Sequence, residues 1–185
     1  MAYPMNVILL CGEAQDHNMR NALLPALERY GGVVYAGQRQ IFRITTEKPA
    51  FFVFDCEHIP EVSLDKGILL FKNSFTGKEE RKLPEHLCCI LESSNHRAAA
   101  LLQQSGSPVI TYGMSARDTL TASSMDRDRM VFSLQRSVTA LSGALLEPHD
   151  FFVTSCSGAS PRQLLPAAAV LLLCGMESAG DGYRI

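Results

Sequence analysis

The stretch Asp55-Cys56-Glu57-His58 places two acids, a thiol and an imidazole side by side in the chain. It closes the apolar segment 50–55, which is predicted to be a buried strand. Open α/β sheets bind ligands at the carboxyl ends of their strands, so Asp55, Glu57 and His58 are candidate ligand-binding residues. These side chains could hold a metal or perform acid–base chemistry. The alternative is an ordinary polar loop at a strand end.

A second group of candidates follows the first apolar segment, 6–11. Gly12, Asp16 and His17 lie in the turn between this predicted strand and a predicted helix at 17–30. Asp16 and His17 could form a carboxylate–imidazole pair, although neighbours in sequence need not face each other. The alternative is that Asp16 caps the start of the helix, where negative charge is favoured.

Strand and helix patterns alternate over residues 1–115. This alternation predicts an α/β fold: a three-layer, Rossmann-like or P-loop-like, mainly parallel sheet with helices on its faces. Residues 116–185 predict an antiparallel β extension and a closing helix, and 1–185 should form a single domain. The other predicted strands are 33–36, 40–45, 67–72, 87–91, 108–112, 119–125, 129–138, 144–147 and 151–155, and the other helices are 95–104 and 160–174.

The residues at the start of the closing helix are typical of a helix N-terminus. Ser160 is a candidate N-cap, and Pro161 suits the first helical position. Residues 177–185 after the helix are predicted to be loose unless they dock.

The composition excludes several classes of function. The net charge of −2 provides no global positive field to hold nucleic acid or an anionic membrane. The apolar stretch 167–176 is far shorter than a membrane span, and no secretory signal is visible, so a cytoplasmic protein is predicted. A homo-oligomer stays open.

The six cysteines include no C-x-x-C pair, so the chain lacks the signature of a zinc ribbon or a thioredoxin. Most lie in apolar runs and are predicted to be reduced core residues, with disulfides as the alternative. Cys88 and Cys89 should point to opposite faces of a strand. No metal site is predicted.

A local basic stretch begins at the end of the segment 67–72. Because two glutamates interrupt it, a solvated loop is favoured over an anion-binding patch. Its cations are Lys72, Lys78, Arg81 and Lys82.

Three stretches, in order along the chain, resemble the central, ATP-binding domain of the Mur ligase family, which includes peptidoglycan-precursor and folylpolyglutamate ligases. The first is ILLCGEAQDHNMRNALL, a strand, glycine turn and helix where a phosphate loop would lie. The second is CCILESSNHRAAALLQQSGSPVITYGMSARDTLTASSM, whose VITYG resembles the family's vi-T-[YF]-G strand. The third is PHDFFVTSCSGASPRQLLPAAAVLLLCGM, which is similar to the closing strand, the G-x-H-N-x-x-N turn and the alanine-rich helix.

The phosphate loop of that family, T-G-T-x-G-K-[TS], is degenerate here. Gly12 is kept, but Gln15 replaces the second glycine, Asp16 the lysine and His17 the hydroxyl that would ligate Mg²⁺. One unit charge pair at ~4 Å and an effective dielectric of ~20 is worth roughly 4 kcal/mol, so exchanging Lys for Asp could cost ~8 kcal/mol before screening. The turn is therefore predicted not to bind ATP in the family's manner.

Other positions of the resemblance are also changed. It implies that Asn95 lies in the ribose-side loop and that Glu57, or equally Asp55, stands near the place of a Mg²⁺-binding glutamate. The turn at 158–163 lacks the family's His-Asn, and no lysine-bearing segment for a second Mg²⁺ is found. The family's first and third domains have no counterpart, which implies a stand-alone domain.

Three functions stay open. The first is a pseudoenzyme, a Mur-ligase-like domain that has lost ATP-dependent ligase activity and binds an unknown small molecule or protein partner without a cofactor. The second is an enzyme of altered chemistry, dependent on ATP and Mg²⁺ or on another metal, that uses a crevice around Asp16, Asp55 and Glu57, with His17 taking part. The third is a structural subunit whose β extension pairs with another chain.

Overall fold

A computed structural model describes residues 5–38, 40–43, 48–77, 83–125, 129–156, 158–176 and 182–185. The strands are β1 (Asn6–Cys11), β2 (Gly32–Ala36), β3 (Ile41–Arg43), β4 (Pro49–Cys56), β5 (Gly67–Phe71), β6 (Leu87–Glu92), β7 (Val109–Gly113), β8 (Leu120–Met125), β9 (Arg129–Leu134), β10 (Val138–Thr139), β11 (Leu145–Leu146), β12 (His149–Thr154) and β13 (Tyr183–Arg184). The helices are α1 (Asn18–Glu28), α2 (His96–Leu102) and α3 (Pro161–Leu173).

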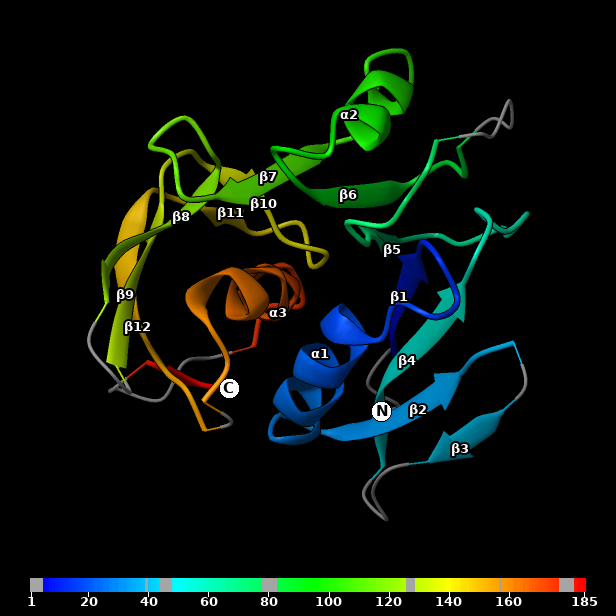
Figure 1. Ribbon diagram of the computed structural model, residues 1–185, viewed down its shortest axis with the longest axis horizontal. Coiled ribbons are helices and arrows are strands. Elements are labelled where there is room, and N and C mark those ends of the chain that lie inside the picture. The colour runs from blue at the N-terminus through cyan, green and yellow to red at the C-terminus, as the bar shows by residue number, and fades with distance from the viewer. Residues whose placement is uncertain are drawn as a thin grey trace.

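One sheet of eleven strands runs through the molecule in the order β13-β12-β9-β8-β7-β6-β5-β1-β4-β2-β3 (Figure 1). The neighbouring strands from β2 to β7 are parallel, and only β3 runs antiparallel at that edge. Helices α1 and α3 cover one face and α2 the other (Figure 1). The predicted three-layer α/β fold with a mainly parallel sheet is confirmed.

The antiparallel part consists of β8, β9 and β12, and the sheet curls around α3 there (Figure 1). The predicted strand 129–138 is in fact two, because β10 leaves this sheet and pairs with β11. The sequence predicts a loose end unless the end docks, and 182–185 do dock: β13 pairs with β12, and the Tyr183 hydroxyl donates to the Met176 carbonyl at 2.7 Å. Residues 177–181 lie outside the described residues.

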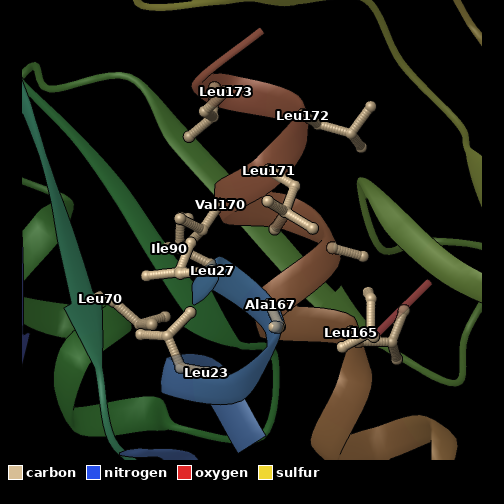
Figure 2. Packing of buried hydrophobic residues seen from close by; sticks show 14 of the residues in the cluster. Leu23, Leu27, Leu70, Ile90, Leu165, Ala167, Val170, Leu171, Leu172 and Leu173 are labelled. Atoms are coloured by element: carbon tan, nitrogen blue, oxygen red, sulfur yellow. The ribbon is translucent and has the colours of Figure 1, made fainter. Parts of the chain in front are cut away.

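The larger core lies between the sheet and the helices α1 and α3. The α1 residues Leu23 and Leu27 belong to the same cluster as Val170 of α3 and the strand residues Leu70 and Ile90 (Figure 2). Helix α3 is apolar nearly all round, as expected of a helix enclosed by the curled sheet. This packing fixes α1, and with it the turn that precedes α1.

A smaller core covers the opposite face of the sheet, under α2. Cys88 faces the larger core and Cys89 the smaller one, so the prediction of two core thiols on opposite faces is confirmed. Burial raises the pKa of the Cys88 thiol to about 11 and that of Cys89 to about 12. Among the described residues, no helix is long and apolar enough to cross a membrane.

Candidate functional site

The turn Gly12–His17 lies at the carboxyl end of β1, between the loops that follow β4 and β5. In the strand order, the connection from β1 through α1 leads past β4 to β2, whereas the connection from β5 leads to β6 in the opposite direction. Ligands of open α/β sheets bind where the connections diverge in this way. The turn thus lies at the carboxyl ends of the parallel strands, as the sequence predicted for Gly12, Asp16 and His17.

Lys72 is the cation of this site, and its side chain is fully buried. The Lys72 ammonium nitrogen Nζ lies 2.7 Å from Asp55 Oδ1 and donates to the Glu13 carbonyl oxygen at 3.0 Å. The lysine backbone continues β5 by donating to the Cys11 carbonyl at 2.8 Å. Lys72 therefore joins three segments under the turn.

The prediction that Lys72 belongs to a solvated basic loop is wrong. Its neighbours in the sequence suggested exposure, but the backbone directs its side chain beneath the turn, where Asp55 from β4 balances its charge. The other three cations of the stretch, at 78, 81 and 82, lie outside the described residues.

Asp55 is buried as well and has a second partner. The Tyr35 hydroxyl of β2 donates to Asp55 Oδ2 at 2.9 Å. Burial raises the pKa of the Tyr35 phenol; Arg20 opposes the rise and the Asp55 carboxylate adds to it. Both oxygens of this carboxylate are thus engaged by the protein.

Gly12 is packed against Lys72. A Cβ atom at Gly12 would lie 2.6 Å from the Lys72 Cβ, which leaves no room for any other residue. The Gly12 amide donates to the Cys56 carbonyl at 3.0 Å, and the Glu13 amide donates to Ser74 Oγ at 3.1 Å. Gly12 therefore allows the turn after β1 to pack closely against the end of β5.

Asp16 lies at the start of α1, where its Oδ1 accepts a hydrogen bond from the Asn18 amide at 3.2 Å. This contact agrees with the capping interpretation. His17 is exposed at the N-cap position, and its side chain makes no capping hydrogen bond. The two residues line different cavities, so the structure does not bring them into one reaction centre.

A crevice of about 490 Å³, the Arg20 cavity, brings three of the candidates together: His17, Asp55 and Glu57. Arg20 and Tyr35 also line it, and the guanidinium carbon of Arg20 lies 5.7 Å from the centre of the Tyr35 ring.

His58 and Gly12 border a separate cavity of about 260 Å³, the Phe75 cavity, which Glu57 also lines. Asp16 borders another, of the same volume, on the α3 side. Among the described residues, no group of three or more His, Cys, Asp or Glu side chains could hold a metal ion.

Asn95 is buried, and the protein engages both polar atoms of its side chain. Its Oδ1 accepts from the Ala98 amide at 3.0 Å at the start of α2, and its Nδ2 donates to the Lys72 carbonyl at 3.1 Å. This candidate therefore supports Lys72 from the other side.

Sequence reasoning missed a second buried carboxylate, Glu92 at the end of β6. It accepts from Asn73 Nδ2 at 2.5 Å and pairs with the Nε of the exposed Arg162 at 3.2 Å. The sequence pattern that identified Asp55 also applies to Lys72 and Glu92, because each of these charged residues directly follows or ends an apolar strand. Charges at neighbouring strand ends are brought together by a parallel sheet.

Comparisons with known proteins bear on the fold. No protein family model and no curated protein matches this sequence. Among solved structures, a UDP-N-acetylmuramoyl-L-alanyl-D-glutamate–2,6-diaminopimelate ligase matches with a TM-score of 0.54 and 11% identity, over 94% of this chain and 44% of the ligase.

Two further ligases agree. A murein peptide ligase from Psychrobacter arcticus has a TM-score of 0.53 and 11% identity, over 92% of this chain and 44% of its own. A UDP-N-acetylmuramoylalanyl-D-glutamyl-2,6-diaminopimelate–D-alanyl-D-alanyl ligase from Acinetobacter baumannii has a TM-score of 0.52 and 12% identity, over 94% of this chain and 44% of the ligase. The chain thus spans less than half the length of these ligases. At such low identity the likeness shows the fold alone, and that fold is the one of the Mur ligase central domain.

Proposed function

We propose that this domain has lost ATP-dependent ligase activity and acts as a binding or regulatory module for a small polar molecule. The observation that carries the proposal is the buried ion pair between Lys72 and Asp55 beneath the turn that would have to hold the phosphates. The ion pair disfavours the binding of a metal ion at Asp55, and the charges of the turn above it disfavour the binding of a nucleotide.

The ion pair competes with a divalent cation. The resemblance implied that Asp55 or Glu57 stands near a Mg²⁺ ligand, but Asp55 already pairs with an ammonium at 2.7 Å. A Mg²⁺ ion that took over Asp55 would leave the Lys72 charge buried without its partner. Separating a buried pair in this way costs about 3–5 kcal/mol.

The charges on the turn also disfavour a triphosphate. Lys72 is neutralised by Asp55 and shielded from solvent, so its field at the surface of the turn is weak. The outer charges that remain on and beside the turn include Glu13, Asp16 and Glu57. Each close pair of like charges near a protein surface costs about 4 kcal/mol at 4 Å before screening.

The Arg20 cavity is the proposed binding site. Its volume of about 490 Å³ is within the usual range for small ligands. Arg20 offers hydrogen-bond donors and Glu57 offers acceptors, and Gln38 Nε2 donates to Glu57 Oε2 at 2.9 Å across its wall. This mixed polar lining favours a small molecule that carries both donors and acceptors.

A thermal-shift screen tests the proposal, because a ligand of the native state raises Tm by mass action. The ligands are ATP with Mg²⁺, divalent metals alone and cell-wall precursors. We expect no shift with ATP and Mg²⁺, and a shift with a polar ligand that Arg20→Ala removes. Lys66→Ala is the matched control, since Lys66 is exposed at the opposite end of β5. Mg²⁺-dependent ATP hydrolysis that Asp55→Asn abolishes would overturn the proposal in favour of an enzyme.

A further inference from the structure

Two cysteines end the strands that carry the ion pair. Cys11 is the last residue of β1, Cys56 is the last residue of β4, and the two are register partners in the parallel pair β1–β4. Register partners on adjacent strands point to the same face of a sheet. Both side chains accordingly lie in the smaller core, and both cysteines carry thiols rather than a disulfide.

Each thiol lies against the backbone of the other strand. Cys56 Sγ donates to the Leu10 carbonyl of β1 at 3.6 Å, and Cys11 Sγ donates to the Glu57 carbonyl, which follows β4, at 3.9 Å. The two sulfur atoms therefore lie in the space between the strands. Adjacent strands are ~4.8 Å apart, which is within the ~4.4–6.8 Å between the Cα atoms of residues joined by disulfides, so rotation of the two side chains is the movement that a bond requires.

A cavity lies next to this pair of cysteines. The Phe75 cavity, of about 260 Å³, is bordered by Gly12 and Glu57, which directly follow the two cysteines in the chain. Cys56 retains 6% of its accessible surface. Both strands also end here, where local opening is easiest.

We propose that Cys11 and Cys56 form a reversible disulfide with hydrogen peroxide as oxidant, which makes the pair an oxidisable site beneath the turn. One thiol gives up its proton, and the thiolate attacks the peroxide and breaks its O–O bond; the sulfur becomes a sulfenic acid, and the leaving hydroxide takes up the proton to give water. The second sulfur displaces the hydroxyl of the sulfenic acid, forming the S–S bond and a second water. Two thiols and one peroxide thus give one disulfide and two waters, and two electrons pass from sulfur to oxygen.

The bond would act directly on the candidate site. Cys11 precedes Gly12, Cys56 follows Asp55, and the Gly12 amide already donates to the Cys56 carbonyl. A disulfide would tie the two strand ends together across this hydrogen bond. The oxidised protein therefore holds the first residue of the turn more rigidly than the reduced protein.

The chain contains its own controls. Cys88 and Cys89 are adjacent in the sequence but face opposite cores, so this geometry does not favour a bond between them. Cys156 is exposed and reports whether the oxidant has reacted at all. A specific Cys11–Cys56 bond can therefore be distinguished from general oxidation.

The test treats the native protein with hydrogen peroxide, blocks remaining thiols under denaturing conditions and maps the peptides by mass spectrometry. We expect the peptides of Cys11 and Cys56 to be linked, the link to be cleaved by a reductant and absent from Cys56→Ser, and hydrogen exchange at the Gly12 amide to slow on oxidation. Oxidation of Cys156 while Cys11 and Cys56 are recovered as thiols would overturn the proposal. So would links spread equally over other cysteine pairs. Neither result depends on whether the Arg20 cavity binds a ligand.

Discussion

The two helices that share the larger core begin in different ways. Before α3, Gln163 Oε1 accepts from both the amide and the hydroxyl of Ser160, at 2.9 Å each. Before α1, the turn is held by Lys72 and Ser74, which are about sixty residues away in the chain. The cap before α3 thus comes from residues close in the sequence, whereas the turn before α1 is held in addition by residues far away in the chain.

This difference shows which contacts hold the turn before α1 in place. A turn that binds phosphate gains stability from its ligand. This turn gains stability from the buried ammonium of Lys72, and from the close packing of Gly12 against the Lys72 side chain. The comparison predicts that substitutions around the turn before α1 and at the start of α3 will differ in the unfolding free energy that they cost.

The largest effect is expected for Lys72→Met. It leaves Asp55 buried without its cation, and removing one partner of a buried pair costs about 3–5 kcal/mol of unfolding free energy. Urea denaturation measures it. Lys66→Met, at the exposed end of the same strand, should change stability by less than about 0.5 kcal/mol.

The double variant Lys72→Met with Asp55→Asn sharpens this result. It removes both charges while the amide oxygen of the new side chain can still accept from Tyr35. We expect the double variant to lose less stability than the sum of the two single variants, by a coupling of about 0.5–3 kcal/mol. Simple additivity of the two single substitutions would contradict a direct ion pair.

A smaller loss is expected for Gln163→Ala. It removes the acceptor of two hydrogen bonds at the start of α3, and losing such a cap costs about 1 kcal/mol. The change in the urea midpoint measures it, and the exposed Gln104, beyond the end of α2, offers a matched Gln→Ala control. An effect as large as that of Lys72→Met would mean that the start of α3 is not a local structure.

The smallest effect is expected for Asp16→Ala. Its carboxylate accepts one hydrogen bond at the start of α1, in a partly exposed position, and a charge at a helix start is worth about 0.3–1 kcal/mol. The loss should shrink as salt is added, because the interaction is screened. A salt-independent loss of several kcal/mol would show that Asp16 has a buried partner.

The order of strands and helices could be read from the sequence because apolar runs, glycines and the Ser160-Pro161 start are local signals. The position of the turn at the carboxyl end of the first strand could be predicted for the same reason. The Lys72–Asp55 pair could not be read, because it joins β5 to β4 across β1 and depends on register. The docking of β13 was missed because a two-residue strand carries almost no pattern of its own.

Isothermal titration of the intact chain with ATP and Mg²⁺ tests the central claim most directly, that the ion pair has replaced the nucleotide beneath the turn. We expect no saturable binding up to about 1 mM, which corresponds to a binding free energy weaker than about −4 kcal/mol. Micromolar, Mg²⁺-dependent binding of ATP that Asp55→Asn abolishes would contradict it.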